Sequence, residues 1–228
     1  MPASEKVRLA VFDCDGTLVD GQHSIIASMH SAFEAHGLTR PPADAVRHVV
    51  GLPLREAIVH LLPDAADTDH ARLEAGYVEA YSALRRKGAV NDPLFPGAVE
   101  TLDALDRAGW ILGIATGKGR RGLLATLDSH GIAGRFAILQ TSDHGPGKPN
   151  PDMLLNAMSE AGAAPADTVM IGDTTYDMEM ARRAGTMAVG VAWGYHPQEH
   201  LRRAGAHAVA RNFAELAEKL AGLGGNTG

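Results

Sequence analysis

The chain has 228 residues, of which 45% are hydrophobic, so we expect a globular, soluble protein with one large or two smaller domains. Its formal net charge of −6 argues against nucleic-acid or anionic-membrane partners, because both require a basic face. We expect no signal peptide and no transmembrane segment, since no uncharged apolar run is long enough. Cys14 is the single cysteine, so an internal disulfide is excluded, which fits a cytoplasmic location.

The first predicted strand, residues 7–12, is apolar and leads into two acidic residues, Asp13 and Asp15. Paired acids at the end of a buried strand need something that compensates their charge, and a divalent cation is the simplest candidate. Asp13 is suited to act as nucleophile and metal ligand, and Asp15 as acid or base on the far side of the reacting atom. The turn through Gly16 and Thr17 offers backbone N–H groups to a phosphoryl oxygen.

The next part of the chain is helical in character. Apolar residues at helical spacing predict helices over 23–36, 54–62 and 68–87, bounded by turn residues at 20–22 and 91–93. We therefore expect a small helical cap domain at 20–93, inserted into a core domain formed by 1–19 and 94–228. An insertion directly after the first strand would lie over the ligand crevice, where it can close on substrate and exclude water.

From residue 94 onward, helices and strands alternate. This alternation predicts an α/β fold with a doubly wound parallel sheet and helices on both of its faces. The predicted helices are 97–108, 119–130, 151–161, 176–184, 197–204 and 213–223, and the predicted strands are 110–116, 136–141, 168–173, 187–193 and 206–210.

The strand at 110–116 ends in a second chemical motif. A hydroxyl and a free backbone N–H at Thr116 and Gly117 can bind a phosphoryl oxygen at the start of the following helix. Lys118 is a candidate substrate-binding residue there. Together with Arg120 and Arg121 it could steer anions, although a solvated start of a helix is the simpler interpretation of this basic cluster.

Two further motifs follow in the second half of the chain. Lys148 lies between a glycine and a proline, on a loop that the proline stiffens. Asp173 follows an apolar strand and suits a magnesium ligand, and Asp177 can reach back to orient a metal-bound water or Lys148. Each motif alone has an ordinary explanation, as a turn, a loop lysine or a helix N-terminal acid. Together they follow separate parallel strands, whose carboxyl ends point into one crevice.

The four motifs FDCDGTLVDG, ATGKGRRG, GKPNPDM and GDTTYDMEMARRAG resemble, in this order, those of the haloacid dehalogenase superfamily, and within it the phosphatases close to phosphoglycolate phosphatase. The resemblance covers essentially the whole chain and implies a Rossmann-like core with a cap. It implies that the site residues have the following roles: Asp13 is the nucleophile, Asp15 the acid/base, Thr116 and Lys148 bind phosphate, and Mg²⁺ is held by Asp13, Asp173, the backbone carbonyl of Asp15, and Asp177 in support.

The implied function is magnesium-dependent hydrolysis of a small phosphate monoester through an aspartyl-phosphate, with 2-phosphoglycolate as the best single guess for the substrate. One alternative is a phosphosugar mutase, but mutases typically carry DGVITD where this chain has DGTLVD, and His23 lies two positions too early. A dehalogenase would need neither magnesium nor an acid at position 15. A catalytically silent phosphate-binding protein should have lost a motif residue, and none is missing.

Specificity is expected to lie in the cap. Related caps place an arginine near the loop 51–56, so Arg55 is a candidate for binding the far end of the substrate, although a surface arginine on the first turn of a helix explains it equally well. When shut, a cap of this size should leave room for only a few carbons. The expected partner is a small-molecule phosphate ester, and the chain is expected to be a monomer or a homodimer.

Overall fold

The computed structural model describes residues 6–143 and 145–223, so the first five and last five residues of the predicted core lie outside the described part. Its centre is a parallel sheet in the order β3-β2-β1-β4-β5-β6, with β1 in the middle between β2 and β4. The strands are β1 (Arg8–Phe12), β2 (Trp110–Thr116), β3 (Ile138–Thr141), β4 (Thr168–Gly172), β5 (Met187–Val191) and β6 (Ala208–Ala210).

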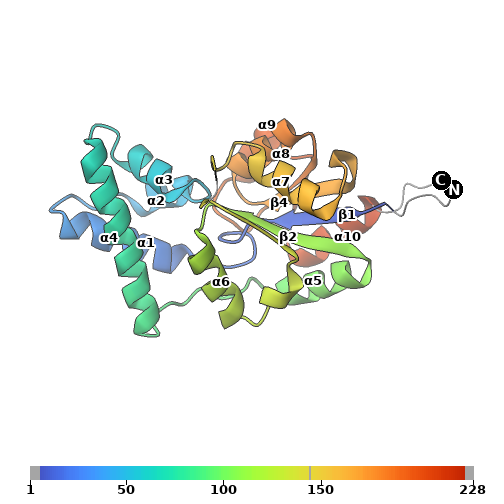
Figure 1. Cartoon of the computed structure of the whole chain (residues 1–228), viewed down its shortest axis with the longest axis horizontal. Helices are drawn as coiled ribbons and strands as arrows, with labels where there is room; N and C mark the ends of the chain where they lie inside the picture. The colour runs from blue at the N-terminus through green and yellow to red at the C-terminus, as the bar shows by residue number, and fades with distance from the viewer. Residues whose placement is uncertain (1–5, 144, 224–228) are drawn as a thin grey trace.

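Helices cover both faces of the sheet, because successive side chains of each strand point to opposite faces. Ala10 and Phe12 of β1 pack against one helical layer, and Leu9 and Val11 pack against the other. Figure 1 shows the second layer above the sheet and the first below it. The layer below consists of α5 (Ala98–Arg107), α6 (Arg120–Ser129) and α10 (Phe213–Leu223), and the layer above of α7 (Asp152–Ala161), α8 (Thr175–Ala184) and α9 (Gln198–Ala204).

The predicted fold class, a doubly wound parallel α/β sheet, is confirmed. The differences lie at the ends of elements: the predicted strand 187–193 ends at Val191, and the predicted strand 206–210 begins only at Ala208. Two short 3-10 helices, Ala133–Arg135 and Pro165–Asp167, precede β3 and β4. These differences are small because a strand buried on both faces is an apolar run whose ends the pattern marks only loosely.

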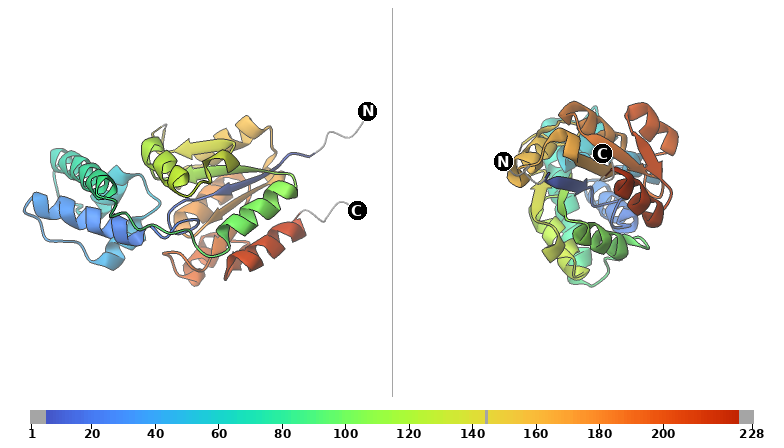
Figure 2. Two further views of the ribbon diagram at one scale, coloured as in Figure 1. Left: turned by 90° about the horizontal axis from the view of Figure 1, so that it is seen from below. Right: turned by 90° about the vertical axis from the view of Figure 1, so that its right-hand side faces the viewer.

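A separate helical unit, the cap, follows β1. It consists of α1 (Gln22–Ala35), α2 (Ala43–Val49), α3 (Leu54–Leu61) and α4 (Asp67–Arg86), and α1 packs against α4 around a core of its own. The sequence did not predict α2, because a helix of seven residues with two buried valines is too short to show a helical period. Figure 2 shows the cap beyond the carboxyl end of β1, which is the end of a parallel sheet where ligands bind.

The two connections between cap and core lie side by side. Val19 forms an isolated antiparallel bridge with Leu94, and the Asp20 N–H donates a 2.8 Å hydrogen bond to the carbonyl of Pro93. The cap is therefore joined to the core through a paired, two-stranded hinge. Among residues 6–143 and 145–223, none of the helices combines the length and the apolarity that a membrane span requires.

Candidate active site

Three buried carboxylates and one buried ammonium meet at the carboxyl ends of β1 and β4. Oxygen atoms of Asp13, Asp173 and Asp177 lie within 4.8 Å of one another. Lys148 Nζ lies 2.8 Å from Asp13 Oδ1 and 2.6 Å from Asp177 Oδ1. Three of the four sequence motifs, the first of them more than a hundred residues before the other two, thus meet at one point. Burial alone would lower the pKa of Lys148, but the carboxylates of Asp13 and Asp177 raise it above its ordinary value.

Asp13 lies directly after β1, and its N–H donates a 2.9 Å hydrogen bond to the carbonyl of Ile171 in β4. Its Oδ1 accepts from the Cys14 N–H at 2.7 Å and faces Lys148, whereas its buried Oδ2 has no hydrogen-bond partner among the described residues. The pKa of Asp13 is raised to about 7, mainly by burial; Lys148 opposes the shift, and the charge of Asp177 adds to it. The carboxyl group is therefore aimed into the site with one oxygen atom free.

Asp173 and Asp177 are fixed by their own hydrogen bonds. Asp173 accepts from the Thr17 hydroxyl at 2.9 Å and from the Tyr195 N–H at 2.8 Å. Asp177 Oδ2 accepts from the N–H and the hydroxyl of Thr174 and so caps α8, while its Oδ1 pairs with Lys148. Because both oxygen atoms of Asp177 are engaged, its geometry supports a role in holding Lys148 in place.

The donor set fits a magnesium ion. Mg²⁺ prefers oxygen ligands, and here three buried carboxylates face a single ammonium group. Burial raises the pKa of Asp173 well above its ordinary value, and the neighbouring charges of Asp13 and Asp177 add to that rise. Gly16 has a φ of +83°, and a Cβ on it would lie 2.3 Å from Asp173 Oδ2, so only glycine lets the turn approach this carboxylate.

Asp15 is paired with a lysine at the floor of the cavity. Lys118 Nζ lies 3.2 Å from Asp15 Oδ2, and the two side chains are only 12% and 10% exposed. Burial lowers the pKa of Lys118, but Asp15 raises it, and the net result lies well above the ordinary value. The interpretation of Lys118 as part of a solvated helix start is therefore wrong. The carboxylate of Asp15 draws the side chain inward, under the ring of Tyr81, whose centroid lies 5.1 Å from Nζ.

Thr116 and Gly117 form the turn at the end of β2, where the cap contacts the core most closely. The Thr116 hydroxyl accepts from the Lys118 N–H at 3.2 Å. A Cβ on Gly117 would lie 2.5 Å from the carbonyl oxygen of Leu52 and 2.7 Å from that of Gly51. Glycine at 117 is thus required for the cap loop to lie directly over the predicted phosphate-binding turn.

A second contact between cap and core involves residues that the sequence analysis missed. The His48 carbonyl oxygen accepts from the Tyr176 hydroxyl at 3.2 Å and lies 3.0 Å from His196 Nε2, and the two histidine rings stack with centroids 4.7 Å apart. The Thr175 N–H donates to His196 Nδ1, so Nε2 carries the proton that reaches His48. No local spacing could have shown this contact, because its partners are 148 positions apart.

Arg55 does not lie in the cavity. Its guanidinium is 2.6 Å from Asp67 Oδ1 and 3.5 Å from Glu74 Oε2, and it also donates to the Asp67 carbonyl, so that it ties the start of α3 to α4. The predicted substrate-binding role of Arg55 is therefore not supported by the geometry. The physical reason is that α4 presents two carboxylates to this side chain within the cap itself.

A cavity of about 680 Å³ separates cap and core. Asp13, Asp15 and Lys118 line its floor. The expectation that a shut cap leaves room for only a few carbons stays a prediction. Val46 and Val49 of the unpredicted helix α2 contribute to the apolar wall. The cap wall includes Ile25, Met29, Val46, Val49, Leu52, Leu54, Tyr77, Val78 and Tyr81.

Comparison with known proteins identifies the family of this chain. A family model described as "Haloacid dehalogenase-like hydrolase" matches residues 10–191. The "Probable phosphatase IndB" of Dickeya dadantii is 35% identical over 91% of both chains. The N-acetylmuramic acid 6-phosphate phosphatase of Pseudomonas aeruginosa is 32% identical over 94% of this chain and 95% of that protein.

Two further relatives extend the comparison. The phosphoglycolate phosphatase of Agrobacterium fabrum is 30% identical over 82% of this chain and 81% of that protein. The crystal structure of a hydrolase from Pseudomonas syringae is 28% identical, with a TM-score of 0.81 over 94% of this chain and 98% of that one. The match of the family model, the identity to these relatives and the shared fold agree, and the chain belongs to the haloacid dehalogenase-like hydrolases.

Proposed function

We propose that the chain is a magnesium-dependent phosphatase that hydrolyses a small phosphate monoester through an aspartyl-phosphate on Asp13. The observation that carries this proposal is the free, buried Oδ2 of Asp13, which lies in the same cavity floor as Asp15 and beside the ammonium of Lys148. Three curated relatives are named as phosphatases, one of them for N-acetylmuramic acid 6-phosphate and one for phosphoglycolate, and these names support the same reaction class.

In the first step, the Asp13 carboxylate attacks phosphorus, and the bond from phosphorus to the ester oxygen breaks. Asp15 must enter this step as the neutral acid, and it gives its proton to the leaving alkoxide. Charge on the three equatorial oxygens is offset by Lys148, by the hydroxyl of Thr116 and by the N–H groups of the Asp13–Thr17 turn. Such preorganised donors supply most of the acceleration in phosphoryl transfer.

In the second step, Asp15, now a carboxylate, takes a proton from a water molecule. The water oxygen attacks the phosphorus of the aspartyl-phosphate, and the bond to Asp13 breaks, which releases inorganic phosphate and restores both carboxyl groups. Lys148 stays between Asp13 and Asp177 through both steps, so that the nucleophile keeps its orientation.

The residues that would hold magnesium are Asp13, Asp173 and the backbone carbonyl of Asp15, with Asp177 acting through Lys148. When bound, the ion supplies positive charge that offsets both the carboxylates and the incoming phosphoryl group. Its presence would also relieve the crowding that raises the pKa of Asp13 and Asp173.

Two substrates are supported by the relatives. 2-Phosphoglycolate is supported by the phosphoglycolate phosphatase of Agrobacterium fabrum. N-acetylmuramic acid 6-phosphate, a larger sugar phosphate that also carries a carboxylate, is supported by the Pseudomonas relatives and by the cavity of about 680 Å³.

The test is a panel of phosphate esters, including both candidates and p-nitrophenyl phosphate, assayed for released phosphate with magnesium and with a chelator. We expect release only with magnesium. A folded protein that releases phosphate from none of the esters would contradict the proposal. The panel also includes a hexose 1-phosphate, which distinguishes a phosphatase from a mutase. A mutase would yield the isomeric hexose phosphate instead of inorganic phosphate.

A further inference from the structure

Helix α4 presents an aromatic surface to the cavity. Tyr77, Val78 and Tyr81 all line it, and we call these three residues the α4 shelf. The shelf is held firmly, because the Tyr81 hydroxyl donates to the buried carboxylate of Asp92 at the hinge, and the rings of Tyr77 and Tyr81 lie 6.0 Å apart. If the part of the substrate that covers this shelf is apolar, binding removes apolar surface from water and gains free energy. A strongly polar group in the same place would not gain this free energy.

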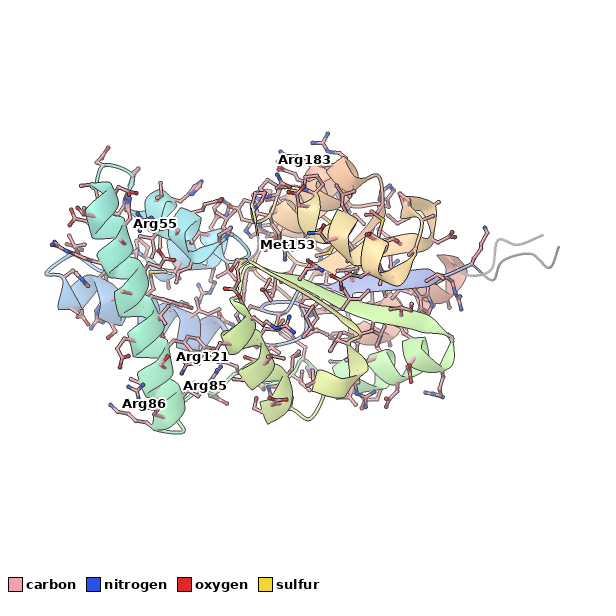
Figure 3. The ribbon with its side chains drawn as sticks, viewed as in Figure 1. Arg55, Arg85, Arg86, Arg121, Met153 and Arg183 are labelled. Carbon is pink, nitrogen blue, oxygen red and sulfur yellow. The ribbon has the colours of Figure 1, made fainter. Side chains whose placement is uncertain are left out.

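Three arginines line the same cavity: Arg86, which pairs with Glu79 at 2.7 Å, and Arg85 and Arg121, which come from cap and core. Arg85 follows Tyr81 by about one turn of α4, and Arg121 lies in the first turn of α6. Arg85 Nη2 lies 3.4 Å from the hydroxyl of Thr126 in α6, which directs the guanidinium across the gap between the two helices. Figure 3 shows Arg85 and Arg121 in this region, where the carboxyl-terminal half of α4 faces α6.

Neither arginine is neutralised. Within residues 6–143 and 145–223, no carboxylate oxygen lies within 4.0 Å of a nitrogen of Arg85 or Arg121. The acids that line the cavity away from its floor are engaged elsewhere. Glu74 pairs with Arg55, and Asp143 accepts from the Arg120 N–H and the Thr141 hydroxyl. This end of the cavity therefore carries two uncompensated positive charges in a chain whose net charge is −6.

We propose that Arg85 and Arg121 form a second anion subsite that selects phosphate esters with a ring-sized body between the phosphate and a distal carboxylate or phosphate group. The proposal rests on the proposed phosphatase function. A cavity of about 680 Å³ is in the range that encloses ligands much larger than a two-carbon acid. The reacting phosphate would lie at Asp13, the ring on the α4 shelf, and the distal anion between the two planar guanidinium groups, which match carboxylate and phosphate oxygens.

The test uses a matched set of aryl phosphates: 4-carboxyphenyl phosphate, 1,4-phenylene bisphosphate and the uncharged 4-carbamoylphenyl phosphate. For the wild-type enzyme we expect kcat/KM to be about 10- to 100-fold higher for the anionic esters than for the carbamoyl ester, the range of a charged hydrogen bond. The bisphosphate value is corrected for its two equivalent ester groups. Whichever anionic ester gives the larger preference identifies the distal group as carboxylate or phosphate.

The variants Arg85→Gln and Arg121→Gln should each lose most of this preference. Arg72→Gln on α4 and Arg120→Gln on α6 are the matched controls, since both residues are exposed and neither lines the cavity, and they should keep the wild-type ratio. Arg121 is exposed, so its replacement leaves the core packing intact and decides the outcome if Arg85→Gln fails to fold.

If the Arg85 and Arg121 variants lose kcat/KM equally for the charged and the uncharged esters, the proposal of a second anion subsite is overturned. A wild-type enzyme that hydrolyses all three esters at similar kcat/KM would also overturn it while leaving the phosphatase function intact. A higher kcat/KM for 2-phosphoglycolate than for 4-carboxyphenyl phosphate would overturn the proposal that the preferred substrates carry a ring-sized body. Failure of the folded wild-type enzyme to release phosphate from any of the esters tested with magnesium, p-nitrophenyl phosphate included, would instead refute the proposed function.

Discussion

The ammonium of Lys148, which has no exposed surface, lies 2.6 Å from Oδ1 of Asp177. The same nitrogen lies 2.8 Å from Oδ1 of Asp13, so a single cation stands between two buried carboxylates. In a buried pair, the removal of one partner leaves the other charged group without water and without a counter-charge. Lys148 therefore contributes to the stability of the fold, in addition to the phosphate-binding role that we propose for it.

We predict that Lys148→Met lowers the free energy of unfolding by about 3–5 kcal/mol in the presence of a chelator, because Asp13, Asp173 and Asp177 then lack their counter-charge. Urea denaturation followed by circular dichroism measures this change. Lys6→Met is the matched control, since Lys6 forms only an exposed pair with Asp167 at 3.9 Å and its loss should cost about 1 kcal/mol or less. A change as small as the control's would show that the carboxylates do not depend on Lys148.

Asp13→Asn should abolish turnover while the fold stays intact. An amide is too weak a nucleophile, and the metal site loses an anionic ligand. Wild-type protein with magnesium should bind beryllofluoride in competition with substrate, and the variant should not. The measurement is kcat/KM on p-nitrophenyl phosphate; activity within about tenfold of wild type, or about 1.4 kcal/mol of barrier, would rule out the covalent route through Asp13.

Magnesium should stabilise the protein more at high pH than at low pH. The pKa of Asp13 is raised from 3.8 to about 7, so between these values the folded protein holds a proton that the unfolded chain releases. This group therefore makes the free energy of unfolding of the metal-free protein fall as the pH rises from about 4 to about 7. Magnesium would bind the ionised carboxylates, so its stabilising effect should grow over the same interval as protons stop competing.

Thermal unfolding at about pH 5 and about pH 8, each with magnesium and with chelator, measures this dependence. Asp13→Asn serves as the reference, because it removes the contribution of that carboxyl group and should flatten the fall in stability with pH. An equal rise in Tm on adding magnesium at both pH values would contradict a site in which protons and metal compete for the same oxygens.

The fold and the gathering of Asp13 and Asp173 at one end of the sheet could be predicted from the sequence, because both depend on local patterns. Asp13 and Asp173 each follow an apolar strand, and the carboxyl ends of parallel strands share one crevice, so their proximity follows from topology. His48 stacks on His196, and Lys118 points inward to Asp15. Both features depend on contacts between residues far apart in sequence, so no local sequence pattern could have predicted them. The part of the cavity wall that α2 supplies could not be predicted, because a helix of seven residues is too short to leave a periodic signal.

Arg55 provides the last prediction, because here the structure and the sequence lead to different expectations. If Arg55 bound the far end of the substrate, Arg55→Gln would lower kcat/KM for 2-phosphoglycolate far more than for p-nitrophenyl phosphate. Since its guanidinium pairs with Asp67 and Glu74 and the side chain is 30% exposed, we expect equal, small losses on both esters. The free energy of unfolding should fall by about 1 kcal/mol or less, as for a partly exposed ion pair.

The ratio of kcat/KM for 2-phosphoglycolate to that for p-nitrophenyl phosphate, measured for wild type and Arg55→Gln, decides between the two expectations. Arg72→Gln is the control, since it removes another ion pair of α4, with Asp69, that also lies outside the cavity. A ratio that falls tenfold or more in Arg55→Gln alone, about 1.4 kcal/mol in transition-state binding, would mean that Arg55 leaves Asp67 when substrate binds. An unchanged ratio means that Arg55 connects α3 to α4 and that substrate selection depends on the residues that line the cavity.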